Sequence, residues 1–299
     1  MDNKSWFLVI ALGFLWGSSF LFVEILLDYM NPFLIVYLRV AIASIILIFY
    51  LFFIKIDIQF SNTLIFNLFI MGLLNNVFPF LLITTGQQYI TGGLASILNA
   101  NTSFMTILIA SLFIKNEKIT KSRFVGVLFG MIGVIVTIGY KNLSGIFSSD
   151  IGKFFILLSS ISYAFAAIFA KIKLNSVDPK LAATGMLTTS TIILSPIMFF
   201  YYSNTIYDLS IISIKYSIAF AVLCSVLAYL IYFKILSTTG PGNLLLCTII
   251  IPPSSIILNV IFINETINIH EFLGMMIIVF GLLILDGRIL KQINFYKKF

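Results

Sequence analysis

The stretch IQFSNTLIFNLFIMGLLNNVFPFLLITTGQQYITGGLASILNANTSFMTILIASLFI, residues 58–114, contains no Asp, Glu, Lys, Arg or His in 57 residues. A helix that crosses a bilayer needs about 20 apolar residues, so this stretch can hold two crossings and the turn between them. Gly86-Gln87-Gln88 and Gly92-Gly93 mark that turn, because glycine clusters interrupt helices. Membrane strands would alternate in polarity over about ten residues, so the continuous run predicts helices.

The rest of the chain repeats this pattern. Hydrophobic residues make up 60% and charged residues only 10% of the 299 residues, whereas soluble domains carry about 25% charged residues. Soluble enzymes and disordered regulators are therefore excluded, and we predict an all-α polytopic membrane protein with ten transmembrane helices. The expected spans are residues 5–27, 32–54, 64–85, 91–114, 121–140, 152–171, 181–202, 214–234, 242–263 and 268–286.

Basic residues predict the orientation. Most of the 18 Lys and Arg residues fall in loops on one side of the predicted membrane, whereas the other side holds only Lys141, Lys153 and Lys215. Cytoplasmic loops carry the excess of Lys and Arg, so both termini are predicted to be cytoplasmic. The net charge of +7 is spread between uncharged runs, which does not indicate nucleic-acid binding. Frequent Ile, Asn, Lys and Phe residues are typical of an AT-rich genome and favour a bacterial inner membrane.

A motif recurs at an offset of 148 residues. The string N-E-x-I-x4-F-x-G-x6-G occupies residues 116–133 and again residues 264–281. The repeat unit holds five spans, and because five is odd the two copies must insert in opposite orientations. We therefore predict two inverted five-helix repeats, 1–141 and 150–287, followed by a basic cytoplasmic tail, 288–299. Glu117 and Glu265 within the motif are expected to cap the next helix.

Several further strings are specific. They are Trp16-Gly17-Ser18-Ser19-Phe20, Tyr37-Leu38-Arg39-Val40-Ala41, Asn75-Asn76 with Phe78-Pro79-Phe80, Gly86-Gln87-Gln88-Tyr89-Ile90, and Gly93-Leu94-Ala95-Ser96-Ile97-Leu98-Asn99-Ala100. With ten spans in two halves, the whole chain resembles the EamA-type branch of the drug/metabolite transporter superfamily. The resemblance implies a secondary transporter of small metabolites, often an exporter of amino acids or related compounds.

The chain departs from the family pattern at three places. Ser103 stands where the family usually has a proline in the fourth span, whereas the ninth span keeps Pro252 and adds Pro253. Helix breaking is therefore expected to differ between the two halves. Many members carry a basic residue late in the first span, where this chain has Glu24, so the charge of a substrate does not transfer from the family.

Polar side chains in the fourth span form the first set of candidate substrate contacts. They recur in steps of three and four, which places them on one helix face: Gln88, Gly92, Ser96, Asn99, Ser103 and Thr106. The ninth span has a matching set in Thr248, Pro252, Ser255 and Asn259. Such stripes can line a cavity for a polar solute, or they can serve close helix packing and interhelical hydrogen bonds. Asn99 is the strongest candidate, because alanine would satisfy packing alone.

Charged and aromatic side chains form the second set. Trp16 lies mid-span and could stack on a ligand or simply pack, and Tyr163 is its counterpart in the second half. Glu24 could exchange protons, bind a cationic solute or be an interfacial carboxylate. Arg39 lies about 10 Å from the outer surface and could pair with Glu24, bind an anionic group or extend outward. Tyr229 and Tyr232 could line an aromatic pocket.

The third span adds a last candidate. Asn76 shares a face with Pro79, which removes one backbone hydrogen bond and is expected to kink the helix.

Sequence motifs for other chemistry are missing. The chain has no H-E-x-x-H, no G-x-S-x-G and a single histidine, His270, so no enzyme, metal site or cofactor is predicted. Cys224 and Cys247 lie in apolar runs and are expected to be buried thiols. The predicted partners are a small-molecule substrate, the lipid bilayer and, through Glu24, protons; a homodimer is left open. The alternatives to a carrier are a membrane scaffold, a channel-like pore or an exporter of drug-like amphiphiles.

Overall fold

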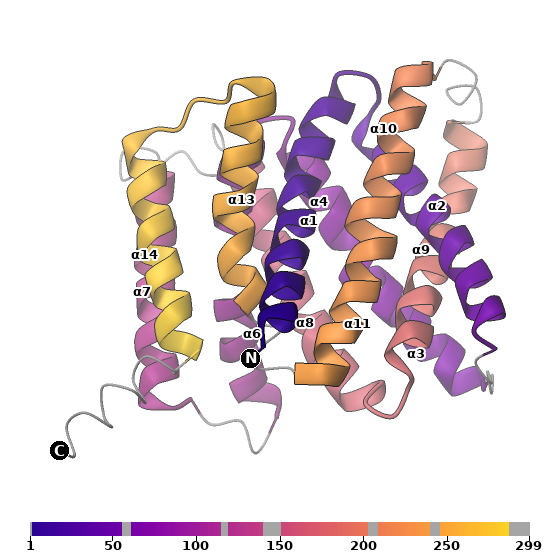
Figure 1. Ribbon diagram of the computed structural model, residues 1–299, viewed down its shortest axis with the longest axis horizontal. Helices are drawn as coiled ribbons and strands as arrows, with labels where there is room; N and C mark the ends of the chain where they lie inside the picture. The colour runs from indigo at the N-terminus through magenta and orange to yellow at the C-terminus, as the bar shows by residue number, and fades with distance from the viewer. Residues whose placement is uncertain are drawn as a thin grey trace.

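The computed structural model describes residues 2–55, 61–114, 119–139, 151–202, 209–239 and 246–286, and every regular element in these ranges is helical. The first five spans are α1 (Asn3–Leu27), α2 (Pro32–Phe53), a third span of α3 (Asn62–Gly72), η1 (Leu73–Val77) and α4 (Phe78–Gly86), a fourth of α5 (Gly92–Asn99) and α6 (Thr102–Phe113), and α7 (Lys121–Ile138). They form one upright bundle with the spans that follow (Figure 1).

The second five spans have the same order. They are α8 (Ile151–Lys173), α9 (Pro179–Tyr201), an eighth span of α10 (Ile211–Ala221), η4 (Val222–Leu227) and α11 (Ala228–Thr239), then α13 (Leu246–Ile263) and α14 (Ile269–Asp286). Within the described ranges, nine spans are long and apolar enough to cross a membrane, and Ile269–Leu285 is a shorter apolar helix. The predicted ten-helix fold class is confirmed, with boundaries within a few residues. Glu117 and the tail 288–299 lie outside the described residues.

Helix starts follow from short polar residues placed at the ends of apolar runs. Asn31 accepts a hydrogen bond from the Leu34 amide at 3.0 Å, and Ser61 accepts one from Leu64 at 3.1 Å. Pro32 stands at the first turn of α2, where a missing N–H costs nothing.

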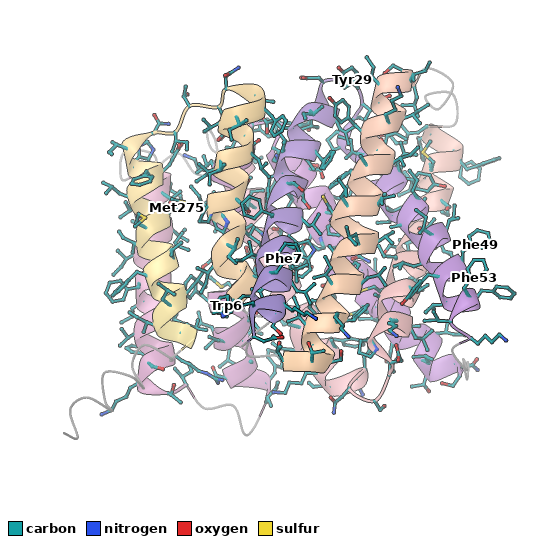
Figure 2. The ribbon with its side chains drawn as sticks, in the orientation of Figure 1. Trp6, Phe7, Tyr29, Phe49, Phe53 and Met275 are labelled. Carbon is teal, nitrogen blue, oxygen red and sulfur yellow. The ribbon has the colours of Figure 1, made fainter. Side chains whose placement is uncertain are left out.

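Large apolar side chains cover the outside of the bundle. Figure 2 shows Phe49 and Phe53 pointing away from α2, and their exposed fractions are 61% and 77%. Such a surface is what a lipid-facing protein requires.

The two halves contact each other in a reciprocal pattern. α7 packs along α14, and α2 packs along α9, so each of these spans meets its own counterpart. α1 packs on α13 while α8 packs on α5 and α6, which exchanges first-half and second-half partners. A two-fold arrangement of the two halves produces this exchange.

The glycines of the repeated motif lie at the contact between α7 and α14. A Cβ atom added to Gly126 would come within 2.9 Å of the Gly281 carbonyl oxygen, and a Cβ added to Gly281 would come within 2.9 Å of the Gly126 carbonyl oxygen. Gly133 and Gly274 oppose each other in the same way, at 3.0 and 2.8 Å. The motif therefore serves close packing of two backbones at one edge of the bundle (Figure 1).

Two π-helical segments stand at matching places, η1 in the third span and η4 in the eighth. The third span is irregular at η1, just before Pro79, but η4 has no proline in it or directly after it, so proline alone does not account for these π-helical segments. Ser162 on α8 donates to the Leu74 carbonyl oxygen of η1 at 2.8 Å.

The fourth and ninth spans differ, as the sequence predicts, but not at a proline. The fourth span breaks at Ala100 and Asn101, where no proline stands, whereas α13 continues as one helix through Pro252 and Pro253. The fourth-span stripe is therefore interrupted. Gln88 lies in the turn before α5 and does not share a face with the residues beyond the break.

Candidate functional site

Aromatic and polar side chains from both halves meet in the interior, and we call them the central group: Trp16, Arg39, Asn75, Tyr163, Tyr229 and Tyr232. The ring of Trp16 lies 5.9 Å from that of Tyr232, which lies 6.5 Å from that of Tyr229. Asn75 donates to the Tyr229 Oη atom at 3.5 Å. Trp16 lies about 16 Å along α1 from its C-terminal end, which is near the middle of a hydrocarbon core of about 30 Å.

Arg39 is held between the halves. Its Cζ atom lies 3.8 Å from the centre of the Phe80 ring on α4 and 4.5 Å from that of Phe220 on α10. Its Nε–H donates to the Ser225 Oγ atom at 3.1 Å, across 186 residues of sequence. The titratable groups that interact with it electrostatically are Cys224, Tyr163 and Tyr229. The predicted alternative of a pair with Glu24 does not form in this structure.

Glu24 belongs instead to a second group at the end of the bundle that the Lys and Arg distribution predicts to face outward. We call it the outer group after that prediction; it comprises Glu24, Gln87, Gly92, Asn259 and Glu265. Gln87 Nε2 donates to the Glu24 carboxylate at 3.2 Å and to the Phe20 carbonyl oxygen at 2.9 Å. A Cβ on Gly92 would meet the Asn259 Oδ1 atom at 2.9 Å, so α5 and α13 approach closely here. Gln87 Oε1 and Asn259 Oδ1 are buried without a hydrogen-bond partner in the part of the chain that the structure describes.

Glu265 caps a different helix from the one predicted. Its carboxylate accepts from the Gly93 amide at 3.0 Å, at the start of α5, instead of capping the next helix, α14. The start of α14 is capped by Glu271, which accepts from the Asn268 amide at 2.9 Å. Burial raises the pKa of Glu265 above its ordinary value. The expectation failed because the loop folds back over α5, which a local motif cannot indicate.

Two amide oxygens beside the break in the fourth span are buried inside the bundle without a hydrogen-bond partner among the described residues. Asn99 ends α5, and its Oδ1 atom is buried without a hydrogen-bond partner among the described residues. The Oδ1 atom of Asn101 is in the same condition. A buried amide oxygen without a partner is unfavourable, so such atoms indicate a place where a water or a solute binds.

A hollow of about 490 Å³ lies at the outer end of the bundle beside Glu24. Its lining residues are Glu24, Ile25, Leu27, Asp28, Gln87, Gln88 and Ile263. Gln88 is exposed there and lies apart from the central group. In the described ranges, no cluster of three His, Cys, Asp or Glu residues has the arrangement of a metal site.

Similarity to known proteins agrees with this architecture. Residues 3–139 and residues 150–285 each match the EamA-like transporter family. The chain belongs to the EamA-like transporter family. Its relatives include the "uncharacterized transporter YetK" of Bacillus subtilis, 26% identical over 90% of this chain and 82% of the relative. The "uncharacterized inner membrane transporter YedA" of Escherichia coli is 24% identical over 92% of this chain and 88% of the relative.

The fold of this EamA-like transporter is also that of a solved structure. A crystal structure matches 95% of this chain and 98% of its own, with a TM-score of 0.68 at 13% sequence identity. At this identity the similarity concerns the fold alone. The membrane-protein class predicted from composition is therefore confirmed by both the helices and the family.

The predicted contact residues of this EamA-like transporter separate into two sets. Trp16, Arg39, Tyr163 and Tyr229 lie in or around the central group, with Asn99 at the helix break. The others have packing partners or lie elsewhere. Asn76 is fully buried and donates to Ser190 Oγ at 3.1 Å.

The small polar residues of the two stripes have hydrogen-bond partners within the bundle. Ser96 donates to the Gly93 carbonyl oxygen of its own helix at 2.7 Å, whereas Ser255 on α13 donates to the Gly92 carbonyl oxygen of α5 at 3.5 Å. Thr248 lies in the first turn of α13.

Sequence reasoning missed Asn75, Phe80, Phe220 and Ser225 as site residues. Asn75 stood beside the chosen Asn76, and a helix places adjacent residues on different faces, so the spacing favoured the wrong neighbour as the one facing the central group. In a chain with 15% aromatic residues, single rings carry little signal. Phe80, Phe220 and Ser225 are identified as site residues only by the packing of α4, α10 and η4 around Arg39.

Proposed function

We propose that the protein is a secondary transporter that moves small polar metabolites, neutral or zwitterionic, by alternating access. The observation that carries this proposal is the central group, which lies at mid-depth and takes side chains from both halves. A carrier of this type binds its solute between two inverted repeats, which then rock around it. The residues of the halves are 1–141 and 150–287.

The proposal includes a cellular location and a direction of transport. We place the chain in the bacterial inner membrane with both termini in the cytoplasm, on the basis of the Lys and Arg distribution and the inner-membrane relative. The family resemblance favours export of amino acids or related compounds. A role for Glu24 in proton exchange stays a prediction, because Glu24 lies in the outer group, away from the central group.

The contacts of the outer group support the proposal that the central group is closed toward the outer side of the membrane. Gln87 on the third span links to Glu24 on α1, and Glu265 from the second half holds the start of α5. For the central group to open outward, the contact between Glu265 and Gly93 must separate, because it joins the two halves at that end.

Counterflow in proteoliposomes tests the carrier cycle. Purified protein is reconstituted, vesicles are loaded with unlabelled L-amino acids as pools, and transient uptake of each labelled amino acid is followed. A carrier accumulates label against its gradient for a time, whereas a scaffold or a simple pore does not. Absence of counterflow for every pool, together with equal leak of all solutes, would establish the pore alternative instead.

The two tryptophans supply a matched pair of variants. Trp16 lies in the central group, whereas Trp6 is on the same helix with 44% of its surface exposed on the outside (Figure 2). Trp16→Ala is expected to reduce counterflow by up to about tenfold, because one aromatic contact contributes about 0.5–1.5 kcal/mol. Trp6→Ala is expected to leave counterflow unchanged. Equal activity of the two variants would remove Trp16 from the transport path.

A further inference from the structure

The charge of Arg39 has no counter-ion in the described part of the chain. The groups that act on it electrostatically are one thiol and two phenols, which are uncharged at neutral pH in their ordinary state. A guanidinium within a membrane protein is costly unless it is paired, and it always keeps its charge. An anion from outside the chain would complete this site.

The hydrogen-bond donors of Arg39 are largely unused as well. A guanidinium carries five N–H groups, and here the Nε–H group donates to Ser225. The Nη groups make no hydrogen bond to the described residues, and the side chain keeps part of its surface accessible although it lies deep in the bundle. The fork that remains open matches the two oxygens of a carboxylate.

The surroundings keep this fork in place. The Cζ atom of Arg39 lies over the rings of Phe80 from the first half and Phe220 from the second, at 3.8 and 4.5 Å, and these contacts use no N–H group. The Tyr229 hydroxyl accepts from Asn75, which leaves its own proton free to donate to an anion. Because α2, α4, α10, η4 and α11 all contribute, the site spans the interface between the halves.

We propose that Arg39 binds the carboxylate group of a transported zwitterionic solute, so that a single carboxylate is the group that this site recognises. One positive charge matches one carboxylate, whereas a phosphate ester with nearly two negative charges would need a second cation. This inference rests on the proposed function and specifies the chemistry of the same site.

Binding is tested separately from transport. Purified protein in detergent is heated with pools of the twenty L-amino acids, with pools of the corresponding amino-acid amides, and with inorganic phosphate. The carboxylate pools are expected to raise the melting temperature of the wild type, and the amides and phosphate are not. The most effective amino acid is then titrated to give its Kd.

Two substitutions at Arg39 and one control identify the group that binds. Arg39→Gln removes the charge and the fork, and it is expected to weaken carboxylate binding by about tenfold or more, as loss of a charged hydrogen bond does. Arg39→Lys keeps the charge and loses the fork, and an intermediate Kd is expected. Lys215→Gln removes one positive charge from the exposed side of α10 and is expected to bind like the wild type.

The outcomes separate the two proposals. Equal protection by amides and carboxylates, protection by phosphate alone, or no protection of the wild type by any carboxylate overturns the Arg39 inference. So does an Arg39→Lys variant that is folded, by its melting temperature without ligand, yet binds carboxylates as the wild type does. Carboxylate binding that depends on Arg39 without any counterflow supports this inference while rejecting the carrier cycle.

Discussion

Repeat-equivalent residues are the same at the contact between α7 and α14. At Arg39, in the central group, they differ. At the contact, Gly126 and Gly133 recur as Gly274 and Gly281, and the four glycines pair reciprocally. In the central group, the position 148 residues after Arg39 is Leu187, which is fully buried. The halves are therefore alike at the contact between α7 and α14 and unlike at Arg39, so a solute bound to Arg39 as proposed would have one preferred orientation.

A substitution at the contact between α7 and α14 is expected to have the largest effect on stability. Gly133→Ala places a Cβ atom 2.9 Å from the Ile278 backbone nitrogen and 3.0 Å from the Gly274 carbonyl oxygen, and neither can move without its helix. We expect the free energy of unfolding to fall by about 1–3 kcal/mol, as overpacking does. The midpoint of unfolding in mixed micelles of detergent and SDS measures this.

The control for this substitution is Gly185→Ala. Its Cβ meets only the Leu68 side chain, which can turn aside, so a change within about 1 kcal/mol is expected after the helix gains from alanine. If both variants lose the same stability, the α7 and α14 backbones are not in the close contact described.

The interior of the bundle, where the halves differ, is tested with a substitution that leaves the fold stable. Asn99→Ala removes an amide whose Oδ1 atom is buried without a partner in the described ranges, so the folded state is expected to be as stable or more stable. Counterflow is expected to show an apparent Km raised by about tenfold, because the lost amide would contact the solute. Asn62→Ala, at the exposed start of α3, is the control. Normal kinetics in Asn99→Ala would exclude Asn99 from the site.

The smallest expected effect concerns the outer group and pH. Burial raises the pKa of Glu265 above its ordinary value of 4.5, with Glu24 and Glu271 as the facing carboxylates. Because the pKa of Glu265 is higher in the folded state, its protonated carboxyl contributes to the free energy of unfolding below pH 4.5. This contribution is lost as the pH rises through the folded-state pKa. Relative to the wild type, Glu265→Gln should therefore gain melting temperature as the pH rises.

Melting curves of both proteins at a series of pH values between 4 and 8 check the sign. A constant difference between the two curves would show that Glu265 does not titrate with folding, and a difference of the opposite sign would show that the contact with Gly93 dominates over burial.

Much of the fold could be predicted, whereas the site could be predicted only in part. The charge-free run of residues 58–114 required two spans, and hydropathy placed the boundaries of the others. Arg39 stands out in the sequence as a basic residue within a span, and Trp16 and Tyr229 are aromatic candidates within spans; all three lie in the central group. Asn76, Ser96 and Ser255 are candidates on helical spacing, and spacing cannot distinguish a hydrogen bond inside the bundle from a cavity wall.

The sequence by itself determined the membrane class, the ten spans and the repeated motif, because each depends on the composition of a local stretch or on a comparison of the chain with itself. Only the tertiary structure decided that the repeated glycines pair with each other, that the fourth span breaks without a proline, that Glu265 caps α5, and that Arg39 lies between Phe80 and Phe220. These features depend on contacts between residues far apart along the chain, up to 186 residues for Arg39 and Ser225, and no local pattern encodes which distant helix a side chain will meet.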